Sequence, residues 1–233
     1  LLPEALAGRG AQIATGWAGS LTMGAGQFCT NPGIAVMIRG ADADAFAEAT
    51  VTALSTTGDQ VMLTDGIAEA YRAGQQRVAR ATGVEELLFS QCERRNAAPS
   101  LYRTTGAAWL ADADLGEEVF GPLGVIVTVE DEAEMRRVAA KLEGQLTCTL
   151  HMDAGDTETA RALLPVLERK AGRILANGFP TGVEVSDAMV HGGPYPASTN
   201  FGATSVGTLS IRRWLRPVCY QNLPETILPS DLT

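Results

Sequence analysis

Short apolar runs alternate with longer segments of helical pattern, and this alternation limits the possible fold more than any other feature of the sequence. The apolar runs lie at 33–40, 125–129, 145–153 and 172–179, and their β-branched residues are typical of strands. Most are separated by segments of ten or more residues that begin with acidic side chains and end at glycine, as helices do. Strands joined through helices need crossover connections. We therefore predict an α/β layered domain with a largely parallel sheet.

The expected elements can be placed along the chain. The first helix is predicted to begin at Pro3 and to stop at the glycines 24 and 26. Further helices are predicted over 42–58 and 65–83, after the strand at 125–129, and over 156–172, where Pro165 should kink or interrupt the helix. The segment 100–112 is predicted to form one or two short strands, and 33–40 a strand buried on both faces. The tract 181–207 is long and rich in Gly, Pro, Ser and Thr, which favours a functional loop. A last strand over 208–221 is predicted to pair with another subunit.

Charge and cysteine spacing exclude several classes of protein. The net charge is −9, which argues against binding to nucleic-acid phosphates. The basic cluster 211–217, with Trp214 inside it, is interpreted as a strand or subunit contact. The four cysteines lie far apart with no metal-binding or dithiol spacing, so we expect no metal and a reduced, cytoplasmic protein. No apolar run is long enough to span a membrane, and none is expected to associate with one.

Three stretches contain residues that suit chemistry, and each has a plainer interpretation. Cys29 lies between a glycine-rich turn and Asn-Pro-Gly in "GAGQFCTNPG", where a thiol is either presented as a nucleophile or buried as apolar filler. The acids in "LGEEVFGPLG" (115–124) either bind a ribose diol or form a solvated turn. His191, in "HGGPYPAS", can titrate near neutrality and reach a ligand, or be incidental to its loop. His151 is expected to be a strand-end residue.

These motifs together resemble one family. "GQFCTNPG", "EEVFGPLGVIVTVED" about ninety residues later, and the block that begins "NGFPTGVEVSDAMVHGGPYPAS" are similar to the C-terminal catalytic half of the aldehyde dehydrogenase superfamily. The last block resembles the branch of 2,5-dioxovalerate (α-ketoglutaric semialdehyde) dehydrogenases and related NADP-using enzymes. The resemblance covers essentially the whole chain and implies a three-layer αβα catalytic domain over 1–207, with a C-terminal strand arm for oligomerisation over 208–233.

The resemblance also implies a role for individual residues. Cys29 would add to the aldehyde carbonyl as a thiolate, giving a thiohemiacetal and then a thioester, with its own backbone N–H as half of the oxyanion hole. Glu118 would bind the nicotinamide ribose of NAD or NADP, with Phe120 packing beside it. Phe28 would line the aldehyde tunnel. His191 has no counterpart in ordinary members and is expected in the substrate pocket of this branch alone.

In the family, the water-activating Glu, the Asn of the oxyanion hole and the dinucleotide-binding domain lie upstream of the cysteine, and none is present in these 233 residues. The expectation is therefore a homo-oligomeric catalytic domain that is inactive on its own, because its general base and its nucleotide platform are missing. The alternative is a non-catalytic fragment that folds and self-associates, exposing the apolar face on which the nucleotide domain would dock.

Overall fold

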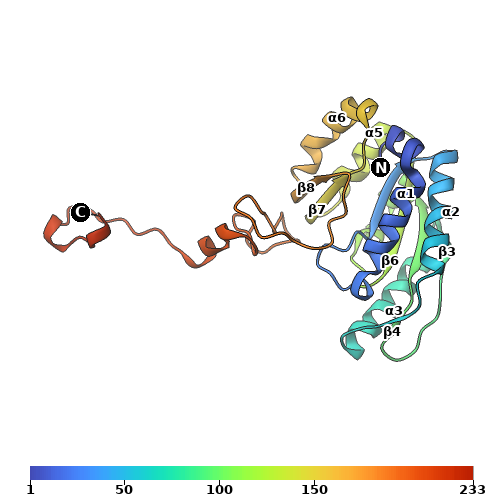
Figure 1. Ribbon diagram of the computed structural model, residues 1–233, viewed down its shortest axis with the longest axis horizontal. Coiled ribbons are helices and arrows are strands. Elements are labelled where there is room, and N and C mark those ends of the chain that lie inside the picture. Colours follow the sequence, from blue (N-terminus) through green and yellow to red (C-terminus); the bar gives the residue numbers. More distant parts are fainter. Residues whose placement is uncertain (233) are drawn as a thin grey trace.

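The computed structural model describes residues 1–232 and is built around a four-stranded sheet in the order β1-β6-β5-β3 (Figure 1). Three of its strands are parallel, namely β1 (Ile34–Ile38), β6 (Leu123–Val129) and β5 (Ser100–Thr105), and β3 (Val84–Leu88) is an antiparallel edge. Two further pairs lie apart from this sheet: parallel β7 (Gln145–Leu150) and β8 (Ala171–Ala176), and antiparallel β2 (Gln60–Val61) and β4 (Asn96–Ala97).

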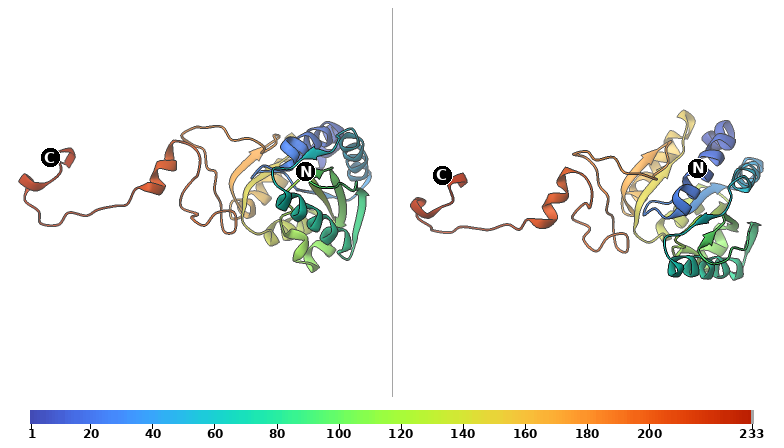
Figure 2. Two further views of the ribbon diagram at one scale, coloured as in Figure 1. Left: turned by 90° about the horizontal axis from the view of Figure 1, so that it is seen from below. Right: turned by 60° about the horizontal axis from the view of Figure 1, so that its bottom comes forward.

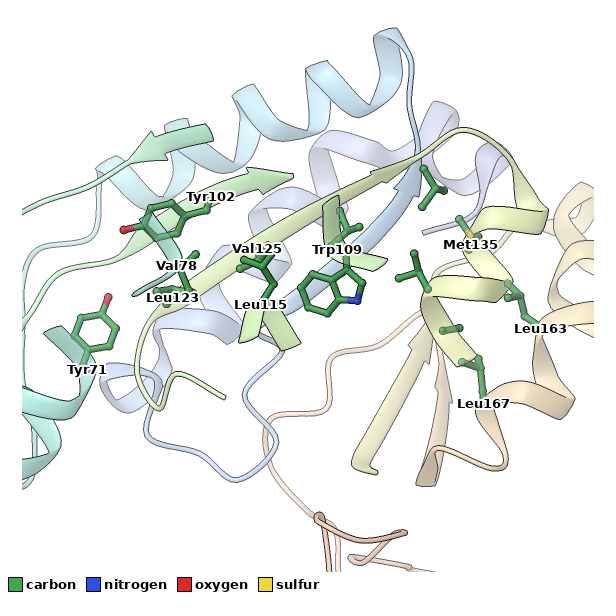
Figure 3. Close-up of a cluster of buried hydrophobic side chains, with 14 of the residues drawn as sticks. Tyr71, Val78, Tyr102, Trp109, Leu115, Leu123, Val125, Met135, Leu163 and Leu167 are labelled. Carbon is green, nitrogen blue, oxygen red and sulfur yellow. The ribbon is translucent and has the colours of Figure 1, made fainter. Parts of the chain in front are cut away.

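Helices cover both faces of the central sheet. One apolar core joins α1 (Pro3–Thr22) and α2 (Ala41–Ser55) to the strands, and it includes Ile126 of β6. The core on the other face includes Val125 and Val127 of the same strand, together with side chains of α3 (Asp65–Arg80), α4 (Gly106–Ala111), α5 (Glu132–Lys141) and α6 (Thr157–Leu167) (Figure 3). Because successive strand residues point to opposite faces, β6 serves both cores. The predicted three-layer α/β/α architecture is confirmed.

Local sequence signals explain where several helices begin. The Asp131 side chain accepts a hydrogen bond from the backbone N–H of Glu134 at the start of α5, and Thr64 does the same for Ile67 in α3, as capping residues do. Pro165 lies in the last turn of α6, two residues before the helix ends. The segment 100–112 forms β5 and then the short helix α4, rather than two strands, because the Thr105 hydroxyl caps that helix at Ala108 N.

The expectation that β1 is buried on both faces is wrong. Ala35 and Met37 are buried against α1 and α2, whereas Ile34, Val36 and Ile38 are only half-buried. The half-buried side chains belong to the side of the strand that borders a cavity, described below.

The C-terminal segment extends away from the folded body as an arm (Figures 1 and 2). The strand predicted over 208–221 is wrong: Thr208–Trp214 is a 3-10 helix, and the chain up to residue 232 continues as extended chain and turns with two more short 3-10 helices, Glu225–Ile227 and Ser230–Leu232. A strand needs a hydrogen-bonded neighbour, and the arm lies against no sheet. The expected arm includes Thr233, which lies outside the described residues. As expected, 181–207 contains neither helix nor strand.

None of the helices in the described part of the chain has the length and apolar character needed to cross a membrane.

Candidate active site

Cys29 lies in the turn between a 3-10 helix (Met23–Gly26) and β1, and it is exposed. The Asn31 side chain fixes this turn, because its Nδ2 donates to the carbonyls of Gly26 at 2.7 Å and of Gly121 at 3.2 Å. The Thr30 hydroxyl donates to the Pro180 carbonyl at 2.9 Å. The thiol therefore stands on a turn that is tied down on both sides, and it does not fill the core.

The cysteine turn and the acidic motif are in backbone contact, although they lie ninety residues apart in the sequence. Gly26 has φ +66°, and a Cβ at this position would overlap the carbonyl carbon and oxygen of Gly121. Only glycine combines this left-handed backbone with so close an approach. Gly26 thus brings the two predicted motifs together.

His191 reaches the thiol from the long loop. Its Nε2 lies 3.2 Å from Cys29 Sγ, within the range of a hydrogen bond to sulfur. The His191 backbone N–H donates to the Thr204 hydroxyl at 2.8 Å, and the N–H and hydroxyl of Ser205 both donate to the His191 carbonyl. The loop therefore folds on itself to hold the imidazole.

The imidazole of His191 is biased toward its neutral form. Burial lowers its pKa from the ordinary value, and the positive charge of Arg173 lowers it further. Its Nδ1 is buried and has no hydrogen-bond partner in the described structure. Because a neutral imidazole carries one acceptor nitrogen, His191 can accept a proton from the Cys29 thiol.

Arg173, on β8, was not singled out from the sequence. Its guanidinium donates to the Pro180 carbonyl at 2.7 Å and to the Gly182 carbonyl at 3.4 Å. The Pro180 carbonyl is the same group that accepts from Thr30, next to Cys29. Arg173 therefore links the start of the His191 loop to the cysteine turn. No local pattern marks this role, because it depends on contacts between distant segments.

A cavity of about 740 Å³ places three of the predicted site residues together. Cys29, Glu118 and Phe120 all line it. Glu118 is exposed and Phe120 is 36% exposed, so both can be reached by a ligand. Phe28 and His191 are not among the described residues that line the cavity. Phe28 is half-buried with its ring close to Gly24.

Helix α3 supports the loop that carries Glu118. Tyr71, Gly74 and Arg77 are spaced three residues apart and so share one face of the helix. The Tyr71 ring packs so closely on Gly121 that it leaves no room for a Cβ there, and Val119 packs on Gly74. The Arg77 guanidinium forms an ion pair with Glu117 at 3.1 Å and donates to the Asp114 carbonyl. The sequence indicated the helix but not this supporting face.

No group of three or more His, Cys, Asp or Glu side chains that could hold a metal ion is present in residues 1–232.

Comparison with known proteins identifies the family. Over its whole length the chain is 53% identical to α-ketoglutaric semialdehyde dehydrogenase 2 of Azospirillum brasilense and 43% identical to α-ketoglutaric semialdehyde dehydrogenase of Acinetobacter baylyi. The chain belongs to the aldehyde dehydrogenase superfamily. It spans 45% of the length of each of these two relatives. No family model matches the chain.

Solved aldehyde dehydrogenases share the fold. The γ-glutamyl-γ-aminobutyraldehyde dehydrogenase of Burkholderia cenocepacia matches 91% of this chain with a TM-score of 0.74 and 18% identity, over 42% of its own length. The glyceraldehyde-3-phosphate dehydrogenase GapN of Methanocaldococcus jannaschii, solved with NADP, matches 77% of this chain and 39% of its own, with a TM-score of 0.62 and 19% identity. At these sequence identities, the structural similarity shows a shared fold and nothing further.

Proposed function

We propose that this chain carries the nucleophile of an NAD(P)-dependent aldehyde dehydrogenase. The observation that supports this proposal most is the contact between Cys29 Sγ and His191 Nε2. In the first step the Cys29 sulfur forms a bond to the aldehyde carbon, and the carbonyl π electrons move to oxygen. His191 takes the thiol proton as this bond forms and passes it to that oxygen, which leaves a neutral thiohemiacetal. The Cys29 backbone N–H is proposed to stabilise the negative charge that develops on the oxygen.

The residues of the cavity fit a nicotinamide cofactor beside the thiol. A carboxylate can accept hydrogen bonds from both hydroxyls of a ribose, and Glu118 is an exposed carboxylate on the same cavity as Cys29. Phe120 offers an accessible ring next to it. Bound NAD or NADP would supply the acceptor for the hydride that leaves the aldehyde carbon. His191 takes the proton of the thiohemiacetal hydroxyl as the thioester C=O forms. Water then cleaves the thioester on Cys29, which releases the acid and restores the thiol.

The substrate proposed for the longer enzyme is α-ketoglutaric semialdehyde. Two relatives at 53% and 43% identity carry this substrate in their names, and the whole of the present chain aligns with each of them. We propose that residues 1–207 form the catalytic domain and that the 233 residues alone do not complete turnover, since the upstream groups that the family uses are not among them. All four cysteines are free, which suits a reducing compartment such as the cytoplasm.

Self-association through the arm is proposed as a second property. Trp214 is 84% exposed, and Ile211, Leu215 and Tyr220 are exposed beside it. So much apolar surface on an extended segment is typical of an interface. We infer that the arm packs on a second copy of this chain.

Aldehyde addition can be tested on the chain itself. α-Ketoglutaric semialdehyde labelled with ¹³C at the aldehyde carbon is added to the wild type and to Cys29→Ser, and ¹³C NMR is used to find a protein-bound tetrahedral carbon. The wild type is expected to show this resonance and Cys29→Ser to lack it. Cys219→Ser removes the other exposed thiol and should keep the signal. A signal that survives Cys29→Ser, or that never forms in the wild type, contradicts the proposed step.

A further inference from the structure

Three consecutive residues shortly before Cys29 have a left-handed backbone. Gly24, Ala25 and Gly26 have φ angles of +58°, +58° and +66°. Glycine adopts this conformation freely, but in alanine the Cβ comes too close to the following carbonyl oxygen. Ala25 is nevertheless buried, with its side chain in the core that includes α3. A strained residue of this kind persists only where its surroundings hold it, and such residues cluster at functional sites.

The side chain of Gln60 holds this turn from a neighbouring segment. Its Oε1 accepts a hydrogen bond from the Ala25 N–H at 2.5 Å. A second glutamine makes the reverse connection, because Gln27 Oε1 accepts from the Leu63 N–H at 2.9 Å. The Gln27 Nε2 also donates to the Gly24 carbonyl at 3.0 Å. Two glutamine side chains therefore tie the left-handed turn to the segment that begins at Gln60.

Gln60 is itself held in place. It belongs to β2, whose two residues pair with β4. The Met62 N–H donates to the Arg95 carbonyl at 2.8 Å, and the Arg95 guanidinium donates to the Met62 carbonyl at 2.9 Å. Contacts that do not involve the cysteine turn thus fix the position of Gln60.

The direction in which the chain leaves the turn decides where the thiol lies. Cys29 follows shortly after Gly26, and its Sγ lies 3.2 Å from His191 Nε2. On the other side of the cysteine, Asn31 Nδ2 donates to the Gly26 carbonyl at 2.7 Å. A right-handed backbone at Ala25 would send the chain in another direction. The Gly26 carbonyl would then move away from Asn31, and the thiol would move away from the imidazole.

We propose that Gln60 is a positioning residue for the nucleophile: its side-chain oxygen holds Ala25 in the left-handed turn and so keeps Cys29 within reach of the imidazole. This role rests on the proposed function of Cys29. Gln60 is not among the described residues that line the cavity, so it acts through the turn. Without its oxygen the Ala25 N–H loses its acceptor, and the strained turn relaxes.

Competition between two thiols of one molecule tests this role. Rate constants for alkylation of Cys29 and Cys219 by limiting iodoacetamide at pH 7 are compared by peptide mass spectrometry. Gln60→Met keeps the length of the side chain but has no oxygen to accept the bond. The ratio of the Cys29 rate to the Cys219 rate is expected to fall about fivefold or more. Gln76→Met makes the same change at an exposed position of α3 and should leave this ratio unchanged.

A second substitution separates support of the turn from general damage. Ala25→Gly removes the Cβ and with it the steric cost of the left-handed backbone, so in combination with Gln60→Met it should restore the ratio to within about twofold of the wild type. Gln60→Asn, whose amide is one methylene shorter, should act like Gln60→Met and gives the same test if the methionine variant does not fold. In either single variant of Gln60, the Ala25 amide should exchange with solvent about tenfold faster or more.

The outcomes separate this role from the proposed function. If Cys29 of the wild type reacts no faster than Cys219, the proposed nucleophile fails, and the role of Gln60 fails with it. If Cys29 is the faster thiol but the Gln60 variants keep the wild-type ratio, Gln60 has no positioning role and the proposed function stands. Loss of the ratio without recovery in the combination with Ala25→Gly, or unchanged exchange at the Ala25 amide, also overturns the positioning role.

Discussion

At the scale of single residues, the proposed chemistry depends on a thiol and an imidazole that meet on a tethered turn. Because burial and the charge of Arg173 lower the pKa of His191, the neutral imidazole is favoured, and its free nitrogen can accept a hydrogen bond from the thiol. We therefore expect His191 to take the proton while Cys29 attacks, rather than beforehand.

Replacement of His191 tests this role. His191→Gln keeps a polar side chain of similar reach but cannot take up a proton, so the rate constant for alkylation of Cys29 by iodoacetamide at pH 7 should fall at least tenfold. In the wild type the rate should also fall as the pH drops through a pKa below 6.5, where the imidazole becomes protonated. This acidic limb should be absent from His191→Gln. A variant that reacts as fast as the wild type, with the same pH profile, would show that the imidazole takes no part in the reaction of the Cys29 thiol.

The family resemblance placed Cys29, Glu118 and Phe120 in one site, whereas the turn signals of their motifs alone left the plainer interpretations open; the three residues line one cavity. Sequence reasoning could not find Asn31 or Arg77, which donate to carbonyls far away in the chain. It also missed Arg173, because the Pro180 carbonyl to which Arg173 donates meets the distant Thr30 hydroxyl only in the fold. A long-range hydrogen bond leaves no periodic pattern in the sequence. Positioning residues of this kind become visible only once the fold brings their partners together.

At the scale of elements, the site depends on the backbone contact between Gly26 and Gly121. Gly26→Ala should lower the free energy of unfolding by about 2 kcal/mol or more and slow alkylation of Cys29, because an added Cβ overlaps the Gly121 carbonyl. Gly19→Ala, within α1 and with open space around the new Cβ, should be neutral or stabilising by up to about 1 kcal/mol. Urea unfolding of both variants measures the difference, and equal effects would contradict the importance of this contact.

The elements themselves were largely predictable where acidic first turns and terminal glycines mark a helix, as in α2, α3 and α5. α4 was missed because six residues are too few to show a helical period. The terminal strand was wrong because "TLSIRRW" has an apolar pattern that suits a strand only when a partner edge is present.

At the scale of the whole molecule, stability should depend on the pH through His151. Burial, and then the charges of the Leu1 amino group and Arg9, lower the pKa of His151 to about 4, against about 6.5 in the unfolded chain. The unfolded state therefore takes up the proton first as the pH falls, and stability is lost between pH 6.5 and 4, by up to about 3 kcal/mol from this residue. In urea unfolding at pH 7, 5.5 and 4, His151→Gln should lose that much less than the wild type over this range. Parallel losses in both proteins would contradict the assignment.

The arm should govern association without contributing to the fold. Removal of residues 208–233 is expected to abolish any concentration-dependent self-association seen by sedimentation velocity and to leave the thermal midpoint of the body nearly unchanged, because the arm's large apolar side chains are exposed. Trp214→Ser in the full chain should weaken association in the same direction. If the shortened chain associates as strongly as the full one, the contact between copies lies elsewhere.

The central claim, that Cys29 is a prepared nucleophile, is tested most directly by competition between thiols of one molecule. Cys29 and Cys219 are both exposed, but only Cys29 has an imidazole within 3.2 Å, so Cys219 is a control matched for access. At pH 7, with limiting iodoacetamide and peptide mass spectrometry, we predict that Cys29 is labelled at least ten times faster than Cys219. Equal rates at the two thiols, or faster labelling of Cys219, would contradict the account.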